Sequence, residues 1–125
     1  MSLAYFDDTA EIKIVSAGYG TVTRMVERVK VDHLRKAGGD EAVMYVPLYN
    51  VRSIKYVDGS LWDESAPPAG AFTVRVGDAF TYRNTGRNGG TALRPQTVFT
   101  VTEVEVNVRG SHRMRHLKVR GKETT

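Results

Sequence analysis

Apolar and polar residues alternate along most of this chain in short runs, separated by stretches rich in glycine and proline. The period of two is plainest at two places. Ile12 and Ile14 flank Lys13, and the valines at positions 104, 106 and 108 alternate with polar residues. A period of two places successive side chains on opposite faces of a strand. The chain is therefore expected to be mainly β, with at most one short helix.

Turn signals divide the chain into about eight strand segments. We expect strands near residues 11–18, 21–34, 42–49, 51–57, 72–76, 79–83, 97–108 and 114–120. Gly38-Gly39-Asp40, Asp58-Gly59 and Gly77-Asp78 are turn sequences. The last of these joins residues 72–76 and 79–83 into an expected strand pair. Short strands at regular spacing predict a small β-barrel or sandwich of about six to eight antiparallel strands with long loops. At 125 residues, a single β-barrel-like domain over residues 1–125 is expected.

Residues 21–34 fit two patterns. One subset has the spacing of a helical stripe: Val22, Met25, Val26 and Val29. The β-branched residues of the run and the alternation after Val29 favour a strand instead. We predict a strand with a bulge near Met25–Val26. A second bulge is predicted near Thr102, because the inward parity of segment 97–108, expected to be the longest strand, switches there.

Composition excludes several classes of site. The chain has no cysteine, so disulfides and cysteine metal sites are absent. No apolar run is long enough to span a membrane, and the N-terminus lacks the features of a signal peptide. The carboxylates are scattered without an acid–base pair, so no enzymatic activity and no cofactor are expected. His112 and His116, four apart on a strand, do not indicate a metal site, and His33 is interpreted as a packed or surface residue.

Positive charge is concentrated near the C-terminus. Residues 1–74 carry 8 Lys+Arg and 10 Asp+Glu, whereas residues 75–125 carry 10 and 4. The candidate contact residues for DNA or an acidic protein surface are Arg83, Arg87, Arg109, His112, Arg113, Arg115, His116 and Lys118. A second interpretation is that the last strand is an edge strand whose charges deter aggregation. Arg87 belongs to a glycine-rich loop, residues 85–91, which lacks the Lys-Ser/Thr and helix of a phosphate-binding loop.

Aromatic residues give a weaker signal. An exposed face of aromatics and arginines would stack single-stranded nucleic acid, but core packing is the preferred interpretation. Trp62 lies in a proline-containing loop beside two carboxylates. Two interpretations remain open for it. Trp62 either anchors the loop in a partner or folds back and caps the barrel.

Several segments resemble, in order and spacing, the small structural proteins at the head–tail junction of tailed bacteriophages and prophages, called head-closure or minor capsid proteins. The N-terminal matches are EIKIVSAG, TRMVERVKVDHL and DEAVMYVPLYN. AFTVRVGDAFTYR and RGSHRMRHLKVRGK match in the middle and at the end. The chain departs from the family's usual ending in two ways. Leu117 stands where an aromatic residue often occurs, and basic residues replace acidic ones in the last strand.

The resemblance implies a structural subunit that forms a homo-oligomeric ring between portal and tail, with DNA passing through it. The implied partners are portal or adaptor proteins and tail subunits. The implied location is the virion, and the cytoplasm of the bacterial host during assembly. The alternative from another class is a small β-barrel module that works alone and binds nucleic acid directly, which the basic C-terminal half favours.

Overall fold

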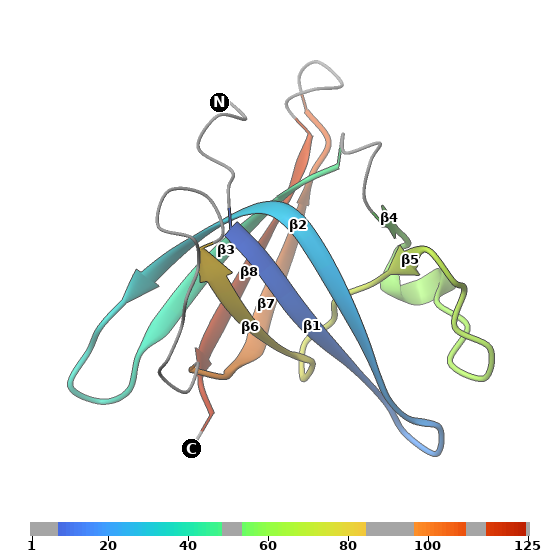
Figure 1. Ribbon diagram of the computed structural model, residues 1–125, viewed down its shortest axis with the longest axis horizontal. Coiled ribbons are helices and arrows are strands. Elements are labelled where there is room, and N and C mark those ends of the chain that lie inside the picture. Colours follow the sequence, from blue (N-terminus) through green and yellow to red (C-terminus); the bar gives the residue numbers. More distant parts are fainter. Residues whose placement is uncertain (1–7, 49–53, 85–96, 110–114, 125) are drawn as a thin grey trace.

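The computed structural model describes residues 8–48, 54–84, 97–109 and 115–124 (Figure 1). Six antiparallel strands close into a barrel in the order β1–β2–β3–β8–β7–β6. These strands are β1 (Asp8–Ser16), β2 (Gly20–Leu34), β3 (Glu41–Pro47), β6 (Ala79–Asn84), β7 (Phe99–Asn107) and β8 (His116–Glu123). Within the described residues the only helix is the short 3-10 helix η2 (Gly59–Leu61). The predicted small β-barrel is confirmed.

The segment between β3 and β6 crosses one end of the barrel. It contains η2 and two short strands, β4 (Lys55–Tyr56) and β5 (Ala71–Phe72), which pair in parallel rather than antiparallel as expected. The predicted pairing of residues 72–76 with 79–83 is wrong. Thr73 and Val74 are both buried, so this stretch enters the core instead of alternating on a sheet. Strand β6 pairs with β1 and β7.

Strand β2 is the longest described strand, with 15 residues, and it bends sharply over the barrel (Figure 1). The predicted strand is confirmed, but the bulge is at Arg28 rather than at Met25–Val26. Arg28 has a positive φ of 59°, and the register with β1 jumps there from Glu27 to Val29. The extra residue reverses the side-chain parity, so Val26 and Val29 both face the core. This explains why the sequence imitates a helical stripe.

The second predicted bulge is confirmed. The register of β7 with β8 shifts between Val101 and Glu103, around Thr102. The expectation that this segment forms the longest strand is wrong, because β7 has 9 residues and β2 has 15.

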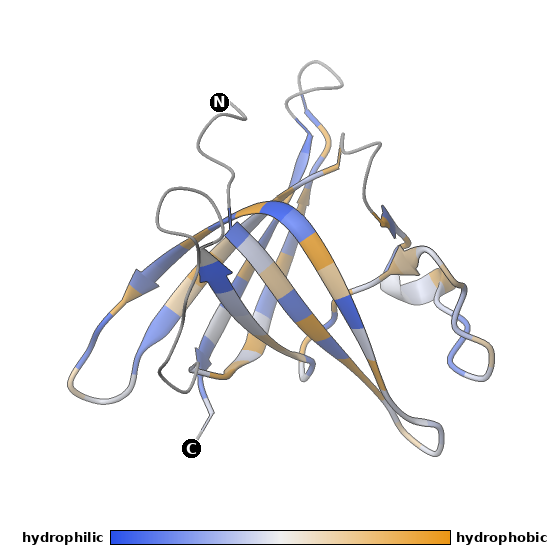
Figure 2. Cartoon of the chain, in the orientation of Figure 1, coloured by the Kyte–Doolittle hydropathy of each residue, from blue (hydrophilic) through white to orange (hydrophobic). Residues whose placement is uncertain are grey.

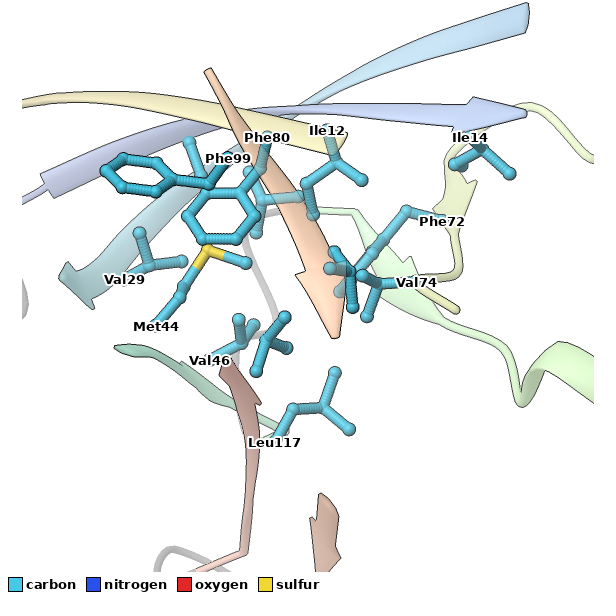
Figure 3. Packing of buried hydrophobic residues seen from close by; sticks show 14 of the residues in the cluster. Ile12, Ile14, Val29, Met44, Val46, Phe72, Val74, Phe80, Phe99 and Leu117 are labelled. Carbon is cyan, nitrogen blue, oxygen red and sulfur yellow. The ribbon is translucent and has the colours of Figure 1, made fainter. Parts of the chain in front are cut away.

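Apolar side chains from every barrel strand meet inside the barrel, while polar residues alternate with them on the outside (Figures 2 and 3). The rings of Phe80 and Phe99 stack with centroids 5.4 Å apart. Phe72 and Val74 extend the same core into the crossing segment (Figure 3). Burying each side chain of this size contributes about 1.5–3 kcal/mol. The prediction that most aromatics pack in the core holds for Phe72, Phe80 and Phe99.

Candidate interaction surface

Strand β8 is not an edge strand. It pairs with β3 from Glu41↔Lys122 to Pro47↔His116, and with β7 on its other side. The interpretation that its charges protect a free edge is therefore wrong. Strand β7 is paired with β6 only at Phe99 and Thr100, and β8 is its only described strand partner beyond that point.

The basic residues of β8 face acidic residues on the neighbouring strands. Arg120 lies opposite Glu103, with 3.8 Å between Nε and Oε2. Lys118 lies opposite Glu105, and Lys122 lies opposite Glu41. Directly opposed unlike charges stabilise a sheet modestly and largely cancel each other's field. Lys118 is thus one of three basic residues that each lie opposite a glutamate. The net positive charge that the sequence predicted along this strand is therefore smaller than expected.

Exposed arginines remain where the β7–β8 hairpin extends beyond the arch of β2 (Figure 1). We call residues 106–109 and 115–117 the arm. Arg109 and Arg115 are exposed, and neither makes an ion pair within the described part of the chain. The Arg109 N–H donates to Asn107 Oδ1 at 3.1 Å, and the Leu48 N–H donates to the Arg115 carbonyl at 3.0 Å. These two hydrogen bonds hold the backbone of the arm in place at Arg109 and Arg115.

The sequence-predicted contact residues do not all gather on the arm. Arg109, Arg115 and His116 do, and the His116 ring lies 6.1 Å from that of Tyr45. Arg83 is exposed at the far end of β6, where it pairs with Thr9 of β1. Arg87, His112 and Arg113 lie outside the described residues.

The arm also carries a feature that sequence reasoning missed. Val106 has the inward parity of β7, and Val108 follows directly after the end of that strand, yet both are exposed. Val106 pairs with Leu117, which is fully buried, so the apolar face of the hairpin continues past the core. The uninterrupted alternation from 104 to 108 was the available signal. It showed a strand face but not where the core would end.

Trp62 folds back onto the barrel. Its side chain is buried, with 6% exposure, in the same cluster as the barrel interior. The second interpretation of this residue, a cap on the barrel, is therefore correct, and its assignment as a loop anchor for a partner is wrong. The indole Nε1 has no hydrogen-bond partner among the described residues.

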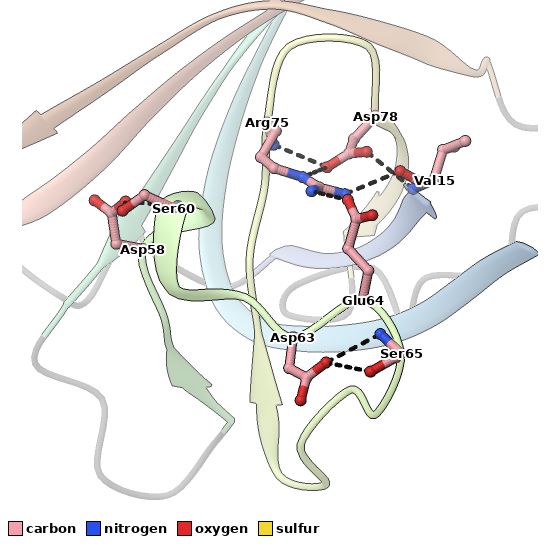
Figure 4. Close-up of polar contacts among 8 residues, drawn as sticks. All are labelled: Val15, Asp58, Ser60, Asp63, Glu64, Ser65, Arg75 and Asp78. Carbon is pink, nitrogen blue, oxygen red and sulfur yellow. Dashed lines mark hydrogen bonds and ion pairs between the residues drawn. The ribbon is translucent and has the colours of Figure 1, made fainter. Parts of the chain in front are cut away.

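Arg75 joins three segments beside this cap (Figure 4). Its guanidinium contacts Glu64 Oε1 at 2.6 Å and donates to the Val15 carbonyl at 2.9 Å. Its own backbone N–H donates to the buried carboxylate of Asp78. Nearby, hydrogen bonds from Ser65 hold the pKa of Asp63 below its usual value, which keeps that carboxylate charged. The result is a rigid surface with acidic groups at its margin.

A second polar group lies at the opposite rim. His33 hydrogen-bonds through Nε2 to Asp40 Oδ2 at 2.7 Å and through Nδ1 to the Tyr82 hydroxyl at 2.8 Å. The His33 bond is the main cause that lowers the pKa of Asp40, while burial raises the pKa of Tyr82. An ionised Asp40 only accepts, so Nε2 of His33 donates the hydrogen bond to it. This line of bonds ties β2 to β6 and to the β2–β3 turn.

An apolar cavity of about 250 Å³ lies between the barrel and the crossing segment, lined in part by Val46, Ile54 and Phe72. Among the described residues, no cluster of three or more His, Asp or Glu side chains forms a possible metal site. The same part of the chain contains no helix long and apolar enough to cross a bilayer.

Comparison with known proteins adds no assignment. No known protein family, no curated protein and no solved structure matches this chain. The surfaces above are therefore interpreted from their own geometry and from the motif resemblance.

Proposed function

We propose that this chain is a structural subunit of the head–tail junction of a tailed bacteriophage or prophage, where it contacts other copies of itself and neighbouring virion proteins. The observation that carries this proposal is the arm, on which Val106 and Val108 stay exposed beside Arg109 and Arg115. Exposed apolar residues that lie close together are typical of a surface that a partner covers. Arginine is enriched in such interfaces.

The balanced charges of the barrel surface support a protein partner over nucleic acid. A phosphate-binding surface needs positive charge that is not already neutralised. Here Lys118, Arg120 and Lys122 lie opposite glutamates. Among the described aromatic residues, Trp62, Phe72, Phe80 and Phe99 are buried, and Tyr56 and Tyr82 pack against the core, so these rings are not free to stack bases. These observations weaken the alternative of a small barrel module that binds nucleic acid on its own.

In this proposal the partners are portal or adaptor proteins on the head side and tail subunits on the other. The chain assembles into a ring, and Arg109 and Arg115 contact either an acidic neighbour or the DNA inside it. Its place is the virion, and before assembly the cytoplasm of the bacterial host. The work is mechanical, so it requires neither a cofactor nor catalysis.

Disruption of the gene in the phage or prophage that carries it tests this proposal. Electron microscopy of the lysate should show DNA-filled heads and separate tails, and expression of the chain from a plasmid should restore joined particles. Intact infectious particles without the chain would refute the proposal. A purified chain that stays monomeric and binds DNA with steep salt dependence would support the nucleic-acid alternative instead.

A further inference from the structure

We infer that the arm of one copy docks on the surface around Arg75 of the next copy, in a head-to-tail contact. We call this second surface the platform and define it by Val15, Leu61, Asp63, Glu64 and Val76. The inference rests on the proposed function, because it names the two surfaces through which subunits of a ring would meet.

The arm brings exposed apolar and positively charged groups close together in the sequence and in the strand pairing. Val106 and Val108 are 42% and 56% exposed. Arg115 immediately precedes β8, two residues before Leu117, which pairs with Val106. Arg109 lies next to Val108. An occupant of the arm therefore needs apolar groups with negative charge beside them.

The platform offers the complementary set. Leu61, Val76 and Val15 are 76%, 69% and 50% exposed. Arg75 brings these positions together, because it bonds to Val15, precedes Val76 and packs against Gly59, two residues before Leu61. The acidic members Asp63 and Glu64 follow Leu61 closely, and Glu64 pairs with Arg75.

Charge decides between the possible occupants of the arm. If two arms met across a two-fold axis, Arg115 and Arg109 of one copy would face the arginines of the other, and like charges in an interface are unfavourable. The platform instead presents the exposed carboxylate of Asp63, while Glu64 is paired with Arg75. Because the arm and the platform are different surfaces, their contact is heterologous and propagates from copy to copy. Such contacts form a closed ring or an open filament.

Both surfaces are held in place before they meet. The Leu48 N–H fixes the Arg115 carbonyl at the base of the arm. On the platform, the carboxylate of Asp78 holds the backbone N–H groups of Val15 and Arg75 at 2.9 and 2.8 Å. Surfaces that are already ordered lose little conformational entropy on association, so less of the binding free energy of the contact is lost to ordering.

Disulfide cross-linking tests the contact, since the chain has no cysteine of its own. One variant carries Val108→Cys and the other Leu61→Cys. The two are mixed and mildly oxidised. We expect the mixed disulfide dimer to form at least about tenfold faster than either homodimer, because docking raises the effective concentration of the two thiols. The matched control replaces Leu61→Cys with Leu34→Cys, which is 48% exposed at the far end of β2. Thermal unfolding verifies that each variant folds.

Each outcome decides the inference. Fast homodimerisation of Val108→Cys would show arm-to-arm contact and overturn it, as would a mixed rate equal to that of the Leu34→Cys control. If either occurs while gene disruption still separates heads from tails, the proposed function survives and only the contact is wrong. If the mixed dimer forms as expected but particles assemble without the chain, the contact is real and the proposed function fails.

Discussion

Asp78 and Val15 are 63 residues apart in the sequence and are joined by a 2.9 Å hydrogen bond, from the Val15 backbone N–H to Oδ1 of the buried carboxylate. The second oxygen, Oδ2, accepts the backbone N–H of Arg75 at 2.8 Å. One side chain therefore fastens the turn before β6 to the end of β1. At this point the pairing between β1 and β6 has ended, whereas Val15 still pairs with Thr21 of β2.

Asp78→Asn should destabilise the fold by about 1–3 kcal/mol, because an amide supplies one acceptor and turns an N–H donor towards the other buried N–H group. Urea unfolding measures this loss. The control is Asp63→Asn, whose carboxylate is exposed and bonds within its own turn. A loss for Asp78→Asn no larger than that of the control would contradict the assigned role.

Gly121 permits close packing inside the barrel. A Cβ at this position would lie 2.9 Å from Phe80 Cε1 and 3.0 Å from Phe99 Cβ. Gly121→Ala should therefore cost about 1–3 kcal/mol through overpacking. Gly38→Ala is the matched control, because a Cβ there meets nothing within 4 Å and its φ is not positive. We expect the control to leave stability unchanged or to raise it slightly. Equal thermal unfolding of the two variants would contradict this packing.

Trp62 is the only tryptophan, so its fluorescence reports on the cap directly. Because the ring is buried, we expect a blue-shifted emission and protection from acrylamide in the isolated chain. Trp62→Ala should cost about 3–5 kcal/mol. Trp62→Phe should cost less, because it keeps most of the apolar contact and removes an indole N–H that has no described partner. Emission typical of an indole in water would show that the loop does not cap the barrel.

The fold was largely predictable because period-two alternation is a local property of the sequence. Bulge positions were only partly predictable. Thr102 was placed correctly, since valines flank it on both sides with changed parity. Arg28 was missed, because a residue with positive φ is unusual outside glycine and left no compositional signal. The entry of Thr73 and Val74 into the core depends on tertiary packing.

The candidate site was less predictable, because the register between two strands cannot be derived from the sequence of either strand alone. Lys118 and Arg120 looked like uncompensated charge until pairing placed Glu105 and Glu103 opposite them. Trp62 illustrates the same limit, since its loop composition allowed both a capping and a docking position. The sequence did identify Arg109 and Arg115 as exposed cations. Within the described part of the chain, strand pairing places no carboxylate opposite either of them.

Acid should lower the free energy of unfolding, because it protonates Asp40. Its pKa is lowered in the folded chain, chiefly by the hydrogen bond from His33. A carboxyl group with a lowered folded pKa adds stability that is present above its unfolded pKa and is lost as the pH falls through the folded pKa. The wild type should therefore exceed Asp40→Asn in unfolding free energy at pH 6, and the difference should shrink below about pH 4. Urea titrations across this range measure it. A difference that stays constant down to pH 2.5 would exclude this coupling.

Arg115→Ser separates assembly from folding. Arg115 is exposed, and exposed charges contribute little to stability, so we expect an unfolding free energy within about 0.5 kcal/mol of the wild type. Self-association should weaken by about two- to fivefold per contact, since an exposed ion pair contributes roughly 0.5–1 kcal/mol. Raising the salt concentration should weaken the wild type in the same way and should affect the variant less.

Lys13→Ser is the matched control for this variant, because Lys13 is an exposed cation on β1 outside both the arm and the platform. Sizing by light scattering over a range of concentrations compares the three proteins. If Lys13→Ser lowers self-association as much as Arg115→Ser does, net charge rather than the arm governs assembly. If Arg115→Ser instead unfolds several degrees below the wild type, the arginine is part of the fold. Only a selective loss of association at unchanged stability assigns Arg115 to a contact between subunits.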